Sequence, residues 1–132
     1  MKRTDNPIFA DTSAWIEFFK PGSKTGNALE RLIVKSSVWI SGIVLFELIQ
    51  GVRSEDEKSK ILATMSNLQY IEMSKPLWQK ASELASLLRK RGLTLPLSDI
   101  LIATVAIEHR LSILTLDKHF EQVPGVRIYK IQ

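Results

Sequence analysis

Four acidic residues stand alone within stretches of the chain that are otherwise apolar. They are Asp11, Glu47, Asp99 and Asp117. A carboxylate on a buried element costs free energy unless it is paired, protonated or bound to a cation. Four such placements in one chain therefore require a shared explanation, and their positions along the predicted elements supply one.

Two of these acids are expected to end parallel strands. Residues 8–10 form an apolar run that is too short for a helix, and Asp11 follows it, just before a helix predicted to begin at Thr12. Asp117 follows a second apolar strand predicted over residues 112–116. In open α/β sheets, ligands bind at the edge formed by the carboxyl ends of the strands. Both carboxylates are therefore expected at that edge.

The other two acids belong to helices that start at the same edge. Asp99 lies at the start of a helix predicted over residues 98–110, and this helix leads into the strand that Asp117 ends. Because the helix runs antiparallel to that strand, its first turn lies at the edge of the sheet where the strand ends. Glu47 lies about five residues into a helix predicted over 42–52, roughly 8 Å along it at ~1.5 Å per residue. Its long side chain can still reach the edge, so we expect all four acids to converge.

The remaining pattern predicts strands that alternate with single or paired helices. The expected strands are 8–10, 38–41, 70–72, 112–116 and 127–131, and the expected helices are 12–19, 27–35, 42–52, 54–67, 77–91, 98–110 and 118–122. This order indicates an α/β fold with a mostly parallel sheet and helices on both faces, joined by right-handed crossovers. Helix 42–52 is apolar almost all round and is expected to be largely buried.

Composition narrows the possibilities further. A chain of 132 residues favours one domain, expected to span residues 1–132. No uncharged stretch is long enough for a membrane helix, which predicts no membrane partner, and a cytoplasmic address fits the absence of cysteine. That absence also excludes disulfides, thiolate metal sites and cysteine nucleophiles. Any metal must be held by oxygen atoms or by the two histidines.

Convergent carboxylates without basic neighbours indicate a metal site. The anions repel one another and raise the pKa of some members, and a divalent cation relieves the repulsion. Oxygen ligands favour Mg²⁺, with Mn²⁺ as a plausible substitute. Such ions activate water and neutralise phosphate charge, so phosphodiester hydrolysis is the leading interpretation. The formal net charge is +4 although these acids are included in the count, so the remaining surface is more basic and suits a polyanion.

Structural roles compete with this interpretation. Asp11, Asp99 and Asp117 could each simply cap the helix that follows it. Glu47 lies in the middle of a helix and cannot cap it. If Glu47 is not part of a site, it is an isolated surface residue on a mostly buried helix. The conjunction of the four acids is what favours a site.

Four further polar residues accompany the acids. Ser13 and Thr115 lie close in sequence to Asp11 and Asp117, where they could orient a ligand or simply cap the backbone. His109 near a helix end and His119 two residues after Asp117 are expected to be surface residues or to satisfy helix dipoles rather than to act directly.

Four segments of the chain together resemble the PIN-domain ribonucleases, and specifically the VapC toxins of toxin–antitoxin pairs. They are Ile8-Phe9-Ala10-Asp11-Thr12-Ser13, Phe46-Glu47-Leu48-Ile49-Gln50-Gly51-Val52, Leu97-Ser98-Asp99-Ile100-Leu101-Ile102-Ala103-Thr104-Val105-Ala106 and Ile113-Leu114-Thr115-Leu116-Asp117-Lys118-His119-Phe120. They span nearly the whole chain in the order and at the spacing of that family. Ile100 and Thr104 depart from it, since small alanines are common at those positions.

The resemblance implies a parallel sheet of about five strands and a Mg²⁺- or Mn²⁺-dependent endoribonuclease that cuts single-stranded RNA. It also implies homodimerisation and inhibition by a small cognate antitoxin protein. By the same resemblance, Asp11, Asp99 and Asp117 would hold the metal, directly or through water. Glu47 would complete the acidic quartet and orient the attacking water.

Other functions remain compatible with parts of the pattern. A PIN nuclease of RNA processing would work without an antitoxin, and a non-catalytic RNA-binding or scaffold protein could share the fold, although the complete set of acids argues against the latter. An aspartyl-phosphate phosphotransferase is disfavoured because Ser13 stands where that chemistry usually requires a second aspartate.

Overall fold

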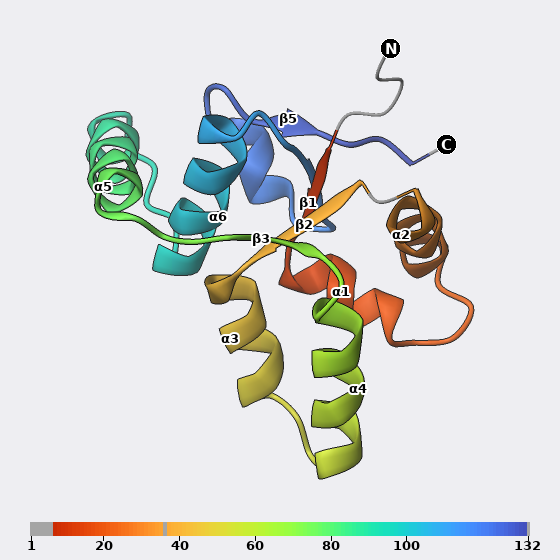
Figure 1. The fold of residues 1–132 in the computed structure, drawn as a ribbon. Coiled ribbons are helices and arrows are strands. Elements are labelled where there is room, and N and C mark those ends of the chain that lie inside the picture. The colour runs from red at the N-terminus through yellow and green to blue at the C-terminus, as the bar shows by residue number, and fades with distance from the viewer. Residues whose placement is uncertain (1–6, 36, 132) are drawn as a thin grey trace, which may run out of the picture.

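Five short strands form one sheet at the centre of the molecule (Figure 1). The computed structural model describes residues 7–35 and 37–131. The strands are β1 (Ile8–Ala10), β2 (Val38–Ser41), β3 (Gln69–Ile71), β4 (Ser112–Leu114) and β5 (Arg127–Ile128). Their order is β3-β2-β1-β4-β5, and every neighbouring pair is parallel, which confirms the predicted fold class.

Helices cover both faces of this sheet. They are α1 (Thr12–Phe18), α2 (Lys24–Val34), α3 (Gly42–Gln50), α4 (Glu55–Met65), α5 (Lys75–Lys90), α6 (Leu97–Glu108) and the 3₁₀ helix η1 (Lys118–Gln122). The chain moves outward from β1 to β3 and then returns past β1 to β4, so right-handed crossovers place α1 and α2 on one face and α5 and α6 on the other. Figure 1 shows α5 and α6 on the opposite side of the sheet from α1 and α2.

Strand β1 is the most protected element of the sheet. Its three residues are fully buried because β2 and β4 flank it and helices cover both faces. Ala10 pairs with Leu114 of β4, and the Asp11 N–H donates to the Leu114 carbonyl at 3.1 Å. The register therefore places Asp11 beside Thr115, at the carboxyl edge of the sheet.

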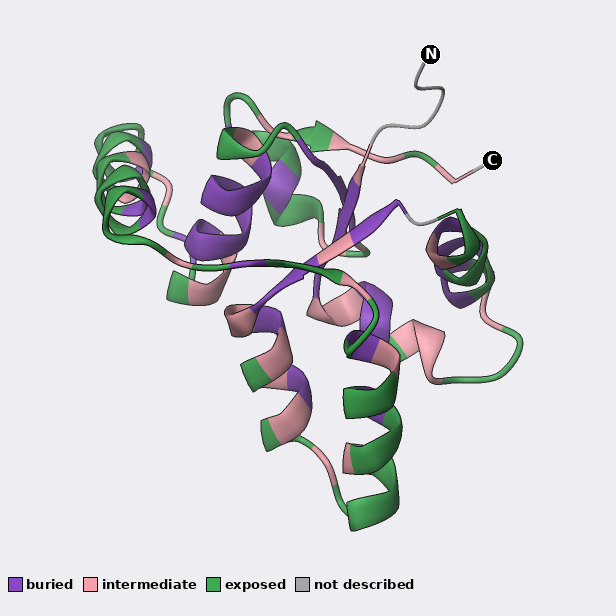
Figure 2. Cartoon of the chain, in the orientation of Figure 1, coloured by how far each residue is buried: buried purple, intermediate pink, exposed green. Residues whose placement is uncertain are grey.

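The two most apolar helices differ in their burial (Figure 2). In α6, every residue from Ile100 to Ala106 is buried. In α3, only Val44 and Leu48 are buried and Phe46 is 61% exposed, so the prediction of a largely buried helix was wrong. The reason is that α3 and α4 form an antiparallel pair extending past the carboxyl edge of the sheet, where one side of α3 has little to pack against (Figure 1).

Despite these apolar segments, none of the helices in the described part of the chain is long and apolar enough to cross a membrane.

Several element boundaries differ from those predicted, and local capping explains two of them. Helix α2 begins at Lys24 rather than at 27, because the Ser23 side chain accepts from the Gly26 N–H, and α5 begins at Lys75 rather than at 77, because Ser74 accepts from the Leu77 N–H. Strand β5 is shorter than the predicted range 127–131. The predicted domain extent, residues 1–132, includes positions outside the described residues and stays a prediction.

Close packing between α1 and α2 gives a test of this arrangement. A Cβ atom at Gly26 would lie 2.6 Å from the Glu17 carbonyl oxygen and 2.9 Å from the Phe18 Cα, both of which are backbone atoms. We expect Gly26→Ala to lower the free energy of unfolding by about 1–3 kcal/mol, as overpacked sites do, although alanine is the better helix former. Urea denaturation measures this change. Gly51→Ala is the control, since its Cβ would meet nothing closer than 3.8 Å. A Gly26→Ala protein as stable as the parent would contradict this packing.

Candidate functional site

The four isolated acids line one pocket at the carboxyl edge of the sheet. The pocket has a volume of about 320 Å³, and its lining residues are Asp11, Thr12, Ser13, Glu47, Gln50, Asp99, Ile102 and Asp117. They come from the β1–α1 junction, α3, α6 and the segment between β4 and η1. The predicted convergence is therefore observed, and no lysine or arginine is among the described residues that line the pocket.

Asp11 is the most buried of these acids, with 5% of its surface exposed. Its Oδ1 accepts hydrogen bonds from the Ser13 hydroxyl at 2.6 Å and from the Ala14 N–H at 3.1 Å, and its Oδ2 accepts from the Thr115 hydroxyl. The capping role is thus real, because the Ala14 bond makes Asp11 the N-cap of α1. Burial nevertheless raises the pKa of Asp11 above its usual value, against the lowering effect of these three bonds.

Ser13 and Thr115 fix the segment after β4 as well as the Asp11 carboxylate. The Ser13 hydroxyl oxygen accepts from the Leu116 N–H at 3.0 Å, and the Thr115 hydroxyl oxygen accepts from the Asp117 N–H at 2.9 Å. Each hydroxyl therefore donates to Asp11 and accepts from the backbone near Asp117. This arrangement holds two acids from distant parts of the chain in one place.

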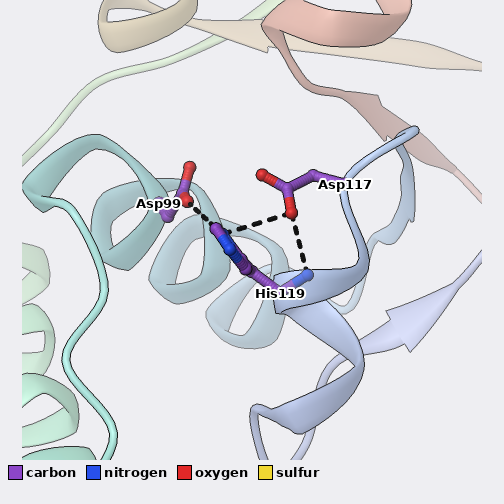
Figure 3. A group of neighbouring side chains, drawn as sticks. All are labelled: Asp99, Asp117 and His119. Atoms are coloured by element: carbon purple, nitrogen blue, oxygen red, sulfur yellow. Dashed lines mark hydrogen bonds and ion pairs between the residues drawn. The ribbon is translucent and has the colours of Figure 1, made fainter.

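Asp99, Asp117 and His119 form the tightest group of possible metal ligands in the described residues (Figure 3). One donor atom from each lies within 4.8 Å of the others. The His119 Nδ1 lies 3.4 Å from the Asp99 Oδ2 and 3.2 Å from the Asp117 Oδ1. Asp117 Oδ1 also accepts from the His119 N–H at 2.9 Å, so Asp117 caps η1 as the alternative interpretation proposed.

Asp99 does not cap its helix. Helix α6 begins at Leu97 with Pro96 in the N-cap position, which places Asp99 within the first turn. Burial raises the pKa of Asp99, and the nearby Asp117 and Asp11 carboxylates raise it further, while His119 acts in the opposite direction. The capping interpretation of Asp99 was therefore wrong, and its carboxylate carries a charge that its surroundings disfavour.

Glu47 reaches the pocket through a contact with α1. Its Oε1 accepts a hydrogen bond of 2.5 Å from the hydroxyl of Thr12. This bond turns the side chain toward the β1–α1 junction, as the predicted reach along α3 requires. Gln50, one turn later on the same helix, also lines the pocket.

The sequence interpretation expected His119 to be a surface residue, and its side chain is 52% exposed, but its contacts with Asp99 and Asp117 were not foreseen, and Thr12 was not singled out. The capped turn after Asp117, which directs the His119 side chain toward Asp99 and Asp117, is seen only in the folded chain. His109 meets its expectation, since its Nδ1 lies 3.2 Å from the Val105 carbonyl oxygen at the end of α6. The sequence alone could not distinguish these two histidines.

The donor atoms in this pocket fit a divalent cation. The carboxylate oxygens of the lining acids, and the His119 imidazole nitrogen that lies close to Asp99 and Asp117, are ligands that Mg²⁺, Mn²⁺ and related ions accept, in differing proportions. Burial is the main cause of the raised pKa values of Asp11 and Asp99, and neighbouring carboxylates add to it, so the ionised forms of both side chains are disfavoured. A bound cation would favour the ionised forms.

These pKa shifts predict an unusual effect of Asp99→Asn on stability. Because the pKa of Asp99 is raised on folding, ionisation of its carboxylate opposes folding. This cost is absent below about pH 4 and grows as the pH rises through the folded pKa. We expect Asp99→Asn to melt no earlier than the parent at pH 7 in EDTA, with the difference shrinking as the pH falls. Thermal melts from acid to neutral pH measure this. Earlier melting of the variant at pH 7 in EDTA would show that the carboxylate is structural.

Two curated proteins of Rickettsia felis are similar to this chain. Ribonuclease VapC2 is 33% identical over 105 residues, which cover 76% of this chain and 78% of that protein. Ribonuclease VapC1 is 29% identical over 119 residues, which cover 79% of this chain and 89% of that protein.

Solved structures are similar over an even larger share of the chain. The structure of VapBC2 from Rickettsia felis, bound to a DNA fragment from its promoter, matches with a TM-score of 0.79 and 26% identity, covering 92% of this chain and 96% of that chain. A toxin–antitoxin complex from Klebsiella pneumoniae matches with a TM-score of 0.73 and 25% identity, covering 96% of this chain and 100% of that chain.

The family model of the PIN domain matches residues 8–126, a range that includes all four acids of the pocket. Together with the VapC relatives, this match leads to one assignment. The chain belongs to the PIN-domain family and, within it, to the VapC ribonucleases.

Proposed function

We propose that this protein is the toxin of a toxin–antitoxin pair, an endoribonuclease that hydrolyses phosphodiester bonds of single-stranded or loop RNA with Mg²⁺ or Mn²⁺. The observation that carries the proposal is the pocket lined by four carboxylates and by no lysine or arginine among the described residues. The names of the relatives, both ribonucleases, support the reaction class. An RNA substrate also favours a cytoplasmic location.

In this proposal, Asp99 and Asp117 hold the cation, and Asp11 contributes from the inner wall of the pocket, directly or through water. When bound, the cation would activate water and neutralise charge on the reacting phosphate. Ser13 and Thr115 position Asp11 through their hydrogen bonds and keep its carboxylate facing the pocket. Both hydroxyls already donate to Asp11 and accept from backbone N–H groups, so we assign Ser13 and Thr115 the role of orienting Asp11.

Glu47 has a different role because it approaches from α3, on another side of the pocket. We propose that its carboxylate orients the attacking water, with Oε1 held by the Thr12 hydroxyl. A fixed carboxylate at hydrogen-bonding distance from the attacking group is what such a role requires. The Thr12 contact restricts the long side chain, so Thr12 acts as a positioning residue.

The antitoxin is proposed to occupy a groove next to the pocket. The groove, about 660 Å³, lies between α1, α3 and α4, and its lining residues are Ile16, Phe19, Lys20, Glu47, Leu48, Gly51, Val52, Arg53, Asp56, Glu57, Lys60 and Ile61. Ile16 is 47% exposed there. Glu47 lines both the groove and the acidic pocket, so a protein segment in the groove would reach the site and block it. The solved relatives from Rickettsia felis and Klebsiella pneumoniae are toxin–antitoxin complexes, which supports a partner of this kind.

Homodimerisation is proposed from exposed apolar side chains near the site. Phe46, Leu97 and Leu116 are each more than half exposed, and each lies within two residues of a pocket acid in the sequence. Large exposed apolar side chains gathered in one region suit a protein contact. A second copy of the chain is the proposed occupant.

Cleavage of RNA tests the reaction directly. We expect the purified protein to cut total RNA in Mg²⁺ but not in EDTA, with new ends identified by sequencing. Asp99→Asn and Glu47→Gln should each reduce the cleavage rate by roughly 100-fold or more, the range expected for loss of a catalytic acid or base. Glu83→Gln is the control, since Glu83 lies exposed on α5 with Gln79 as its hydrogen-bond partner. Equal cleavage in EDTA, or by the Asp99 and Glu47 variants, would refute the proposal.

Inhibition tests the groove. We expect Ile16→Glu to weaken inhibition by the small protein encoded beside this gene by about tenfold or more, because it places a charge where an apolar anchor should pack. RNA cleavage by the free variant should stay at the parental rate. Val34→Glu is the matched control, because Val34 is highly exposed on α2 and does not line the groove. Full inhibition of the Ile16 variant would mean that the antitoxin binds outside this groove. If no small protein encoded beside this gene inhibits cleavage, the alternative of an RNA-processing nuclease without an antitoxin would be favoured.

A further inference from the structure

We infer that His119 supplies a nitrogen ligand to the cation and gives this site a preference for Mn²⁺ over Mg²⁺. The inference rests on the proposed function, since it concerns the cation that Asp99 and Asp117 are proposed to hold. It goes further in assigning a third ligand and a metal preference to this particular chain.

The geometry of the three side chains carries the inference. In an octahedral site with metal–ligand bonds of about 2.1–2.2 Å, neighbouring ligand atoms lie about 3.0 Å apart. The His119 Nδ1 lies 3.2 Å from the Asp117 Oδ1 and 3.4 Å from the Asp99 Oδ2. These two distances are close to two edges of one face of such an octahedron, and all three donor atoms lie within 4.8 Å of one another. Figure 3 shows the imidazole directed toward both carboxylates.

The local backbone keeps the histidine in this position. The His119 N–H donates to the Asp117 Oδ1, so the first turn of η1 is fixed to the same carboxylate that faces the ring. The His119 side chain is 52% exposed and that of Asp99 is 16% exposed, so the face they form remains accessible to an ion from solvent. Binding would not require the fold to open.

The chemistry of the donor set explains the expected preference. Mg²⁺ binds oxygen ligands and gives up its water reluctantly. Mn²⁺ is suited to carboxylates and water as Mg²⁺ is, but as a transition metal it also accepts imidazole nitrogen more readily. Replacing one oxygen of the ligand set by the His119 Nδ1 should therefore favour Mn²⁺. A site made of the Asp99 and Asp117 carboxylates alone would differ less in its affinity for Mn²⁺ and Mg²⁺.

A second arrangement of the same atoms gives the opposite expectation. His119 could act as a positively charged hydrogen-bond donor to Asp99 and Asp117 and so occupy the place of the cation. In that arrangement, removing the imidazole would free the carboxylates and raise metal affinity. Metal binding to a His119 variant therefore separates the two arrangements by the sign of its effect.

Pulsed electron paramagnetic resonance of Mn²⁺ bound to the purified full chain tests the inference without reference to activity. A directly bound imidazole produces a nitrogen modulation, and replacing ¹⁴N by ¹⁵N in the histidines changes its pattern in the parent protein. The sequence contains two histidines, so two variants assign the signal. His119→Gln should abolish the modulation, while His109→Gln should leave it intact, because His109 is at the opposite end of α6 from Asp99.

Calorimetric titration at about pH 8, where histidine is normally neutral, measures the preference. We expect His119→Gln to lower Mn²⁺ affinity by about tenfold or more, since even the outer partners of metal ligands contribute roughly 10–100-fold. Mg²⁺ affinity should change much less, because glutamine offers an oxygen in place of the nitrogen. Thermal melting in EDTA checks that the variant is folded, and the isotope experiment on the parent needs no variant.

The possible outcomes separate this inference from the proposed function. Mn²⁺ binding without nitrogen modulation, or an increase in Mn²⁺ affinity in His119→Gln, would overturn the role of His119 and leave the acidic cation site standing. Failure of the parent to bind either Mn²⁺ or Mg²⁺ would overturn the proposed cation site itself. Nitrogen modulation that persists in His119→Gln and disappears in His109→Gln would also refute the assignment.

Discussion

The rest of the structure depends on how the carboxylate of Asp11 is accommodated almost out of solvent. A buried charge of this kind is tolerated only when its oxygens find donors. Ser13, Ala14 and Thr115 provide three, from the start of α1 and from the segment after β4. Two of these donors also accept from the backbone beside Asp117. One buried acid thereby ties the central strand, its following helix and the neighbouring strand into a single edge.

Burying several carboxylates close together costs free energy, and the same arrangement makes the site suited to a cation. Burial makes the largest contribution to the unfavourable energy of the ionised forms of Asp11 and Asp99, and the neighbouring carboxylates add to it. Functional sites often carry such unfavourable local terms, which the surrounding core offsets. Here the fully buried strand β1 and the buried face of α6 supply the rigid support.

Helix α3 connects the acidic pocket with the neighbouring groove. It extends beyond the sheet, so one side is left partly exposed, while Glu47 turns back to Thr12 on α1. The same helix lines both hollows, and Glu47 is the residue they share. A protein bound in the groove would therefore act on the site through a side chain rather than through a long-range change in the fold.

The sequence by itself determined the element order, the parallel sheet and the convergence of the acids, because strand length, helical periodicity and connection rules are local or topological properties. The end of α5 is likewise a local property, because Gly92, just after the Arg91 C-cap, has a φ of 80° that favours glycine. Tertiary structure decided what depends on distances between separate segments: the exposure of Phe46, the Thr12–Glu47 contact and the place of His119 between Asp99 and Asp117. Periodicity reports which way a side chain faces on its own element, but not which element stands opposite it, and for that reason the two histidines could be told apart only in the folded chain.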